Sequence, residues 1–132
     1  MSEPSLPLQA ALVSALRAPG VLPVDVGVYD EAPAAAPYPY VTLGDCQVLP
    51  DKAACIDGSE VFLQIDVWSR AVGYVEAKKI SRAIVDRLDD QPIVVTGFDV
   101  VLFEIQSVNY LRDPDGQTRH AALTFRTLLN PV

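Results

Sequence analysis

The residue type best suited to proton transfer, histidine, occurs once in the sequence. His120 is the only histidine in the chain, and it follows Arg119 at the start of an expected strand. His120 could therefore serve as a general base. No serine or cysteine nucleophile accompanies it in a catalytic motif. We therefore favour a surface histidine and expect no catalytic residues and no enzyme activity.

Two acidic pairs have residue types suited to a metal or an acid–base site. Asp89 adjoins Asp90, and Asp113 and Asp115 flank a proline in the run Asp-Pro-Asp-Gly. That run is similar to the start of a calcium loop, but the twelve-residue ligand pattern does not continue. Turn chemistry accounts for these residues, and no glycine-rich phosphate loop occurs. We expect neither a metal nor a cofactor.

The two cysteines do not form a metal-binding pattern. Cys46 and Cys55 lie nine positions apart, which fits no zinc motif, and His120 is distant in sequence. The absence of a secretory signal at the N-terminus favours a reducing compartment and two free thiols, with a disulfide across the intervening loop as the alternative. Asp45 would raise the pKa of Cys46, which argues against a reactive thiolate.

Composition and charge favour one acidic globular domain. The chain has 132 residues and a formal net charge of −7, so we expect a single domain over residues 1–132. An acidic chain lacks the basic footprint of a duplex-binding protein. No apolar run approaches the roughly 20 residues of a membrane span. Tyrosines and Trp68 could stack nucleobases, but without interleaved basic residues we favour packing or a protein interface.

The elements that position these groups are clearest at the expected strand from Glu60 to Arg70. Its alternation places four aliphatic side chains on one face, namely Val61, Leu63, Ile65 and Val67. The other face mixes charged residues with Phe62 and Trp68. Faces of that composition often contact another protein. We therefore look for function in surfaces.

The remaining pattern predicts helices and strands in alternating groups. Ser5 is expected to cap a first helix that Pro19-Gly20 ends, and an amphipathic helix is expected over Val72 to Asp89. The other expected strands are Val24 to Asp30, Tyr40 to Val48, Ile93 to Thr96, Val100 to Leu111 and Thr118 to Leu129, with a loop over Leu49 to Ser59 and a hairpin turn at Arg112 to Gly116. This order predicts an α+β fold: a mostly antiparallel twisted sheet of about five to six strands with two helices packed on one face.

Four sequence pieces, in order, carry a family resemblance. They are Val28-Tyr29-Asp30 before a proline-rich loop; Pro39-Tyr40-Val41-Thr42-Leu43-Gly44; Ile65-Asp66-Val67-Trp68-Ser69-Arg70 leading into Glu76-Ala77; and Arg112-Asp113-Pro114-Asp115-Gly116 before a closing strand. Together they resemble the small tail completion, or tail terminator, proteins of long-tailed bacteriophages and gene transfer agents. The resemblance extends from about Leu8 to Leu129.

The resemblance implies a structural virion protein at the tail–neck junction, assembled in the bacterial host cytoplasm. Such proteins form a ring, usually of six copies, that caps the tail tube, ends its polymerisation and joins it to the head-neck. The implied partners are other copies of the chain, the tail tube protein and a neck completion or adaptor protein. DNA passes through the channel without specific binding, and no membrane is involved.

The family has no catalytic residues that could be assigned to this chain, so we choose the candidate contact residues from the pattern of expected surface side chains. We expect Tyr38, Tyr40, Phe62 and Trp68 to contact a neighbouring subunit or the tail tube. Three polar residues of the expected loop, Asp51, Lys52 and Asp57, are candidates for the channel lumen or for docking. The alternatives are a small oligomeric α+β enzyme or ligand-binding domain with an inter-subunit site near His120, Arg119 and Asp66, and a different neck component such as a head completion protein.

Overall fold

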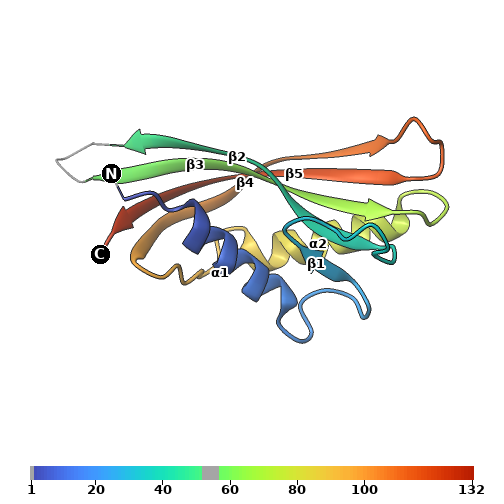
Figure 1. Cartoon of the computed structure of the whole chain (residues 1–132), viewed down its shortest axis with the longest axis horizontal. Helices are drawn as coiled ribbons and strands as arrows, with labels where there is room; N and C mark the ends of the chain where they lie inside the picture. The colour runs from blue at the N-terminus through green and yellow to red at the C-terminus, as the bar shows by residue number, and fades with distance from the viewer. Residues whose placement is uncertain (1, 52–56) are drawn as a thin grey trace.

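Two helices cover one face of a five-stranded twisted sheet in this computed structural model, which describes residues 2–51 and 57–132 (Figure 1). The sheet order is β1-β2-β3-β5-β4, with β1 parallel to β2 and every other neighbouring pair antiparallel. The elements are α1 (Ser5–Arg17), β1 (Gly27–Tyr29), β2 (Tyr40–Asp51), β3 (Gly58–Ser69), α2 (Val75–Leu88), β4 (Phe98–Arg112) and β5 (Arg119–Pro131). The predicted α+β class, the mainly antiparallel sheet and the two helices are confirmed.

The core lies between the helices and the inner face of the sheet. The alternation of β3 buries its four aliphatic residues, and β5 adds Leu123 and Phe125, both fully buried. The apolar stripe of α1 and the stripe of α2 are buried against them. Each element thus places a single apolar face in one shared core, as the periodicities of 2 and 3.6 residues predict.

The predicted strand over residues 93–96 is wrong, which leaves five strands. Only an isolated bridge between Val95 and Phe98 forms there. Gly97 has φ +85°, a left-handed conformation that turns the chain sharply before β4 begins. Ile93 and Val95 are nevertheless buried, while Val94 between them is 89% exposed. The segment alternates like a strand because it packs two side chains onto the core, although its backbone forms one isolated bridge and no continuous strand pairing.

The boundaries of several predicted elements also change. The first helix is not capped by Ser5, because Pro4 holds the N-cap position and Ser5 donates its backbone N–H and hydroxyl to the Glu3 carboxylate. α2 begins at Val75 and not at 72, because Gly73 before it has φ +78°. The predicted loop over 49–59 is shorter, since pairing continues to Asp51 opposite Gly58. Each described helix is too short or too polar to cross a membrane.

Candidate interaction surface

The face of the sheet turned away from both helices is called here the open face. It is lined by the residues of β3 that alternate with the buried aliphatic ones, among them Phe62, Gln64 and Trp68, which are all partly exposed. Both helices lie on the other side of the sheet (Figure 1). The predicted placement of Phe62 and Trp68 opposite the helices is therefore confirmed. An uncovered face that holds large aromatic side chains is available to contact another protein.

Aromatic side chains cluster at one end of the open face. Strand register places Trp68 between Tyr40 on β2 and His120 on β5. The Trp68 and His120 rings stack with centroids 4.0 Å apart and planes 9° from parallel. The Trp68 indole N–H donates to the Thr42 hydroxyl at 3.0 Å, and the Tyr38 ring lies 4.9 Å from that of Tyr40. Neighbouring strands thus build one aromatic group, called here the aromatic cluster, from Tyr38, Tyr40, Trp68 and His120.

Arg70 ties this cluster to the hairpin turn between β4 and β5. Its guanidinium lies 4.3 Å from the centroid of the Tyr38 ring, in cation–π geometry. The same group donates to the Thr118 hydroxyl at 3.2 Å and lies 3.9 Å from the Asp115 carboxylate. Partial burial, followed by the neighbouring Tyr38 hydroxyl, raises the pKa of Tyr40 to about 12, so Tyr40 is a neutral phenol at physiological pH. The end of the sheet is therefore held by side-chain contacts from three separate segments.

His120, whose ring stacks on Trp68, also contacts Asp66. His120 Nε2 and Asp66 Oδ1 lie 2.6 Å apart, and the Gln64 side-chain amide donates to the same oxygen at 2.8 Å. The contacts found among the described residues bring no serine or cysteine to His120. Arg119 turns to the other face, where its guanidinium lies 5.7 Å from the ring of Tyr74. The trio expected for an enzyme is thus divided between the two faces of the sheet.

Phe62 lies apart from the aromatic cluster. Six positions separate it from Trp68 along β3, a distance of about 20 Å in an extended strand. It lines a hollow of about 220 Å³ with Asp45 and Thr124, among others. Across the sheet it faces Arg126, which pairs with Glu60 at 2.6 Å and with Glu104 at 3.3 Å. The structure therefore brings three of the four candidate contact residues together and leaves Phe62 in a polar setting.

The candidate docking residues lie at the far end of the sheet. Asp51 ends β2, and Gly58 opposite it begins β3, whereas the Tyr40–Trp68 pair marks the other end of the same two strands (Figure 1). Asp57 is exposed just before β3. Lys52 lies outside the described residues. The two groups of candidate residues therefore occupy opposite ends of one long sheet and cannot form a single site.

The remaining chemical candidates have structural explanations. Cys46 is a free, exposed thiol, and desolvation together with the nearby Glu3 charge raises its pKa. Cys55 lies outside the described residues. Asp115 accepts hydrogen bonds from the backbone N–H groups of Gln117 and Thr118. In the described ranges, 2–51 and 57–132, no cluster of three or more potential metal ligands occurs.

Sequence reasoning missed the close approach of Gly44 to Asp66. A methyl group on Gly44 would meet Asp66 Oδ2 at 2.5 Å, so the absence of a side chain there leaves room for the carboxylate. Gly44 falls where the β2–β3 register shifts, between Leu43 and Cys46. A glycine inside an alternating strand is the only signal the sequence offers, and it is typical of a bulge.

Comparison with known proteins adds four matches. A family model described as tail completion protein gp17 matches residues 10–130. The tail completion protein gp17 of Bacillus phage SPP1 is 29% identical over 94 residues, which is 71% of this chain and 69% of that protein. A chain in the virion of a native gene transfer agent particle has a TM-score of 0.88 at 28% identity, covering 98% of this chain and 99% of that one. The structure of bacteriophage SPP1 gp17 has a TM-score of 0.62 at 25% identity, covering 93% and 88%.

Proposed function

This chain belongs to the tail completion protein gp17 family, and we propose from that premise that it is a structural component of a phage or gene transfer agent virion, without catalytic activity. The observation that carries the proposal is the structural match to a chain of a gene transfer agent virion, which has a TM-score of 0.88 and extends over 98% of this chain. Agreement over that length includes both helices and the whole sheet. A chain that shares a whole fold and a family with virion proteins is best explained by the same kind of role.

The finer proposal is a tail terminator. Six copies form a ring at the tail–neck junction, cap the tail tube, stop its polymerisation and join it to a neck adaptor protein. Assembly takes place in the bacterial host cytoplasm. The formal charge of −7 on each copy suits a channel that DNA crosses without specific binding, because like charges repel the phosphate backbone. The same charge opposes ring closure, so apolar contacts between subunits must outweigh it.

The open face supplies the proposed contacts with other virion proteins. Tyr38, Tyr40 and Trp68 contact a neighbouring subunit or the tail tube, and Phe62 makes a separate contact on the same face. Large aromatic side chains are enriched among the residues that dominate binding energy in interfaces. Asp51 and Asp57, at the other end of the sheet, face the lumen or a docking partner, as does Lys52 in this proposal.

The mass of the protein in solution, measured across a concentration series with negative-stain imaging of the same samples, tests the proposal. A six-fold ring with a hole wide enough for duplex DNA is the expected result. A compact dimer or trimer without a hole would overturn the terminator role. If the free protein is monomeric, purified tail tubes are added. Tubes with capped ends support the proposal, and tubes that stay uncapped and keep elongating contradict it.

A further inference from the structure

Two exposed apolar patches lie on the helix-bearing side of the molecule, and neither takes part in the core. The first patch is formed by the start of α1 and the segment before β4. Leu6 is 74% exposed and Val94 is 89% exposed, and both line a hollow of about 470 Å³. Pro7, Ala10 and Ala11 also line it, together with the hydroxyl residues Ser14 and Thr96. The hollow is therefore lined mainly by small and apolar side chains, with two hydroxyl groups among them.

The second patch is formed by the start of α2 and the chain that precedes β1. Val24, Val72 and Val75 are 88%, 98% and 66% exposed and line a hollow of about 370 Å³. Pro39 and Lys79 also line it. Val72 extends from the bend between β3 and α2, so its side chain is fully presented to the exterior. A protruding valine beside an apolar hollow could form one side of a protein–protein contact.

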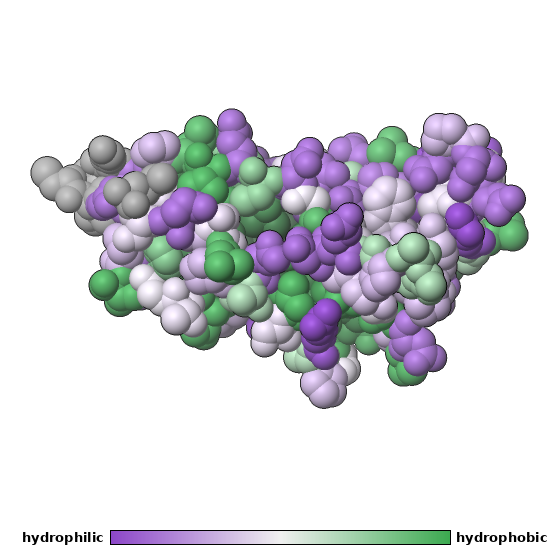
Figure 2. All heavy atoms as spheres, in the orientation of Figure 1, coloured by the Kyte–Doolittle hydropathy of each residue, from purple (hydrophilic) through white to green (hydrophobic). Residues whose placement is uncertain are grey.

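These patches hold most of the large apolar side chains that the described part of the chain leaves in water. Five of the eight such residues belong to them. Figure 2 shows apolar side chains at the surface along the lower, helix-bearing side of the molecule, among polar ones. Single exposed apolar residues are ordinary, but groups of them around a hollow mark a site for a partner.

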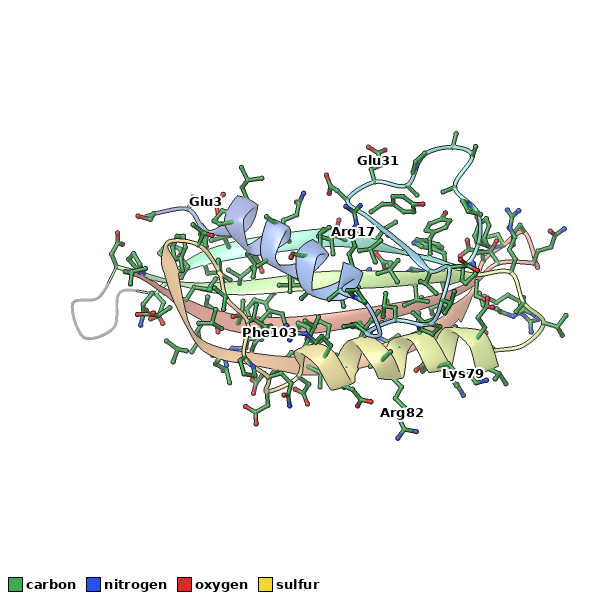
Figure 3. The ribbon with its side chains drawn as sticks, turned by 90° about the horizontal axis from the view of Figure 1, so that it is seen from below. Glu3, Arg17, Glu31, Lys79, Arg82 and Phe103 are labelled. Carbon is green, nitrogen blue, oxygen red and sulfur yellow. The ribbon has the colours of Figure 1, made fainter. Side chains whose placement is uncertain are left out.

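The two patches lie toward opposite ends of the helical layer and differ in charge. Figure 3 shows Glu3, just before the α1 residues of the first patch, at the end of the layer away from Lys79. Lys79 lines the second patch, and Lys78 beside it is also exposed. Glu76 lines the second patch as well, but its carboxylate accepts a hydrogen bond from Ser69 at 2.7 Å. The patches are therefore similar in their apolar centres; Lys79 lines the second patch, and Glu3 lies at the same end of the layer as the first.

We propose that the first patch of one copy docks on the second patch of the next copy, head to tail. This inference rests on the ring proposed above. A ring requires a heterologous interface, in which two different surfaces at different ends of the subunit fit each other. The patches meet that requirement: both are apolar, they point to opposite ends, and Glu3 and Lys79 would attract each other across the joint and set its direction.

One exposed valine in each patch allows a direct test. Val72→Asp and Val94→Asp place a charge in the proposed contact, and the exposure of both positions means that the fold of the monomer is retained. Sedimentation across a concentration series is expected to show that each variant needs about tenfold or more protein for half assembly, because burial of an unpaired carboxylate opposes docking. Val101→Asp is the matched control, since Val101 is 62% exposed and lines neither patch.

A mixing experiment tests the head-to-tail polarity. The Val72→Asp variant keeps an intact first patch, and the Val94→Asp variant keeps an intact second patch. Equal amounts of the two, each assembly-deficient alone, are expected to give a one-to-one heterodimer and nothing larger. An isologous contact, made by the same patch on both copies, predicts no heterodimer. Where the wild-type protein assembles in solution, a mixture that stays monomeric therefore overturns the proposal.

The outcomes separate this inference from the function on which it rests. Suppose that the wild-type protein forms rings and that either variant forms rings at the same protein concentration. That result would be compatible with the terminator role and would refute the pairing of the patches. If Val101→Asp weakens assembly as much as the patch variants do, the patches are not specific and the inference fails. If the wild-type protein assembles only on tail tubes, the same comparison is made there. A wild-type protein that forms no ring in either setting defeats the proposed function itself.

Discussion

Trp68 and His120 stand directly opposite each other on β3 and β5, and their rings stack 4.0 Å apart and 9° from parallel. One face of the indole is covered by the imidazole, and the indole N–H is held by Thr42 at 3.0 Å. The ring is therefore fixed by its own chain while it remains partly exposed. A large side chain that is already ordered loses little conformational entropy when a partner binds, which makes Trp68 the best-placed anchor on the open face.

We predict that Trp68→Asp prevents capping of tail tubes and lowers the free energy of unfolding by about 2 kcal/mol, because a partly buried aromatic surface is lost. Urea unfolding measures the stability, and negative-stain imaging of assembled tails measures the capping. Trp68→Phe is the conservative control, since it keeps an aromatic ring over His120, and we expect it to cap.

Thr42→Val separates the packing of the indole from its surface contact. The variant removes the hydroxyl that accepts the Trp68 N–H and should cost about 1 kcal/mol of stability with capping unchanged. If Trp68→Asp folds and still yields normal capped tails, Trp68 is not at an interface.

We predict that Gly44→Ala destabilises the protein by about 1–3 kcal/mol, the range typical of an added group in a tightly packed site. The new methyl group would meet Asp66 Oδ2 at 2.5 Å, and that carboxylate is held by Gln64 and His120. Chemical denaturation gives the loss. In an Asp66→Ala background the same change should cost less, because the closest contact is removed and only the Gln64 carbonyl oxygen at 3.3 Å remains tight. An equal cost in both backgrounds would contradict the proposed steric cause.

The fold was more predictable from the sequence than the site was, because periodicity reports burial locally. The alternation along β3 and the stripe of α2 each depend on one face meeting the core, so both could be read from spacing alone. The isolated segment around Val95 has the same alternation but pairs with no strand over its length. Periodicity reports which side chains are buried and carries no information on whether the backbone has a partner.

The candidate site depended on register, which spacing does not reveal. The meeting of Asp66 with His120 joins residues 54 positions apart, and it exists because β3 and β5 are neighbours despite the helix and strand between them in sequence. The contacts of Arg70 with Tyr38 and with Asp115 in the hairpin turn likewise join residues that are distant in sequence and are brought together by the fold. The aromatic residues could be proposed as contact residues from the sequence. The structure was needed to show that Tyr38, Tyr40 and Trp68 form one cluster and that Phe62 lies outside it.

We predict that Asp115 supports the hairpin turn at neutral pH and that this support is lost in acid. Hydrogen bonds from the Thr118 backbone N–H and hydroxyl, and from the Gln117 N–H, lower the pKa of Asp115 to about 2. Because the folded pKa lies below the unfolded value of about 3.9, the contribution is fully present above about pH 4 and disappears as the pH falls toward 2. Asp115→Asn should therefore melt at a lower temperature than wild type at pH 7, and the gap should narrow between pH 4 and 2.

Asp113→Asn is the matched control for that experiment, since it removes the same charge from the same turn. Asp113 holds the turn through its backbone, donating its N–H to the Thr118 carbonyl at 2.9 Å, and the substitution keeps that bond. Its melting temperature should stay close to that of wild type. If the difference in melting temperature between Asp115→Asn and wild type is constant from pH 7 to pH 2, the carboxylate charge is not what supports the turn.

We predict that Cys46 reacts slowly with alkylating reagents at neutral pH. Its thiol has a raised pKa, first because of desolvation and second because of the Glu3 charge, so less thiolate is present at a given pH than in an ordinary cysteine. In a Cys55→Ser background, the alkylation rate should therefore reach half its maximum at a higher pH than it does for an unperturbed cysteine. Glu3→Gln should move that midpoint down only part of the way, because desolvation is the larger cause and remains. Glu31→Gln removes an acid that does not contribute to the shift and should leave the midpoint in place; an equal movement in both variants would mean that net charge, and not the proximity of Glu3, sets the reactivity of this thiol.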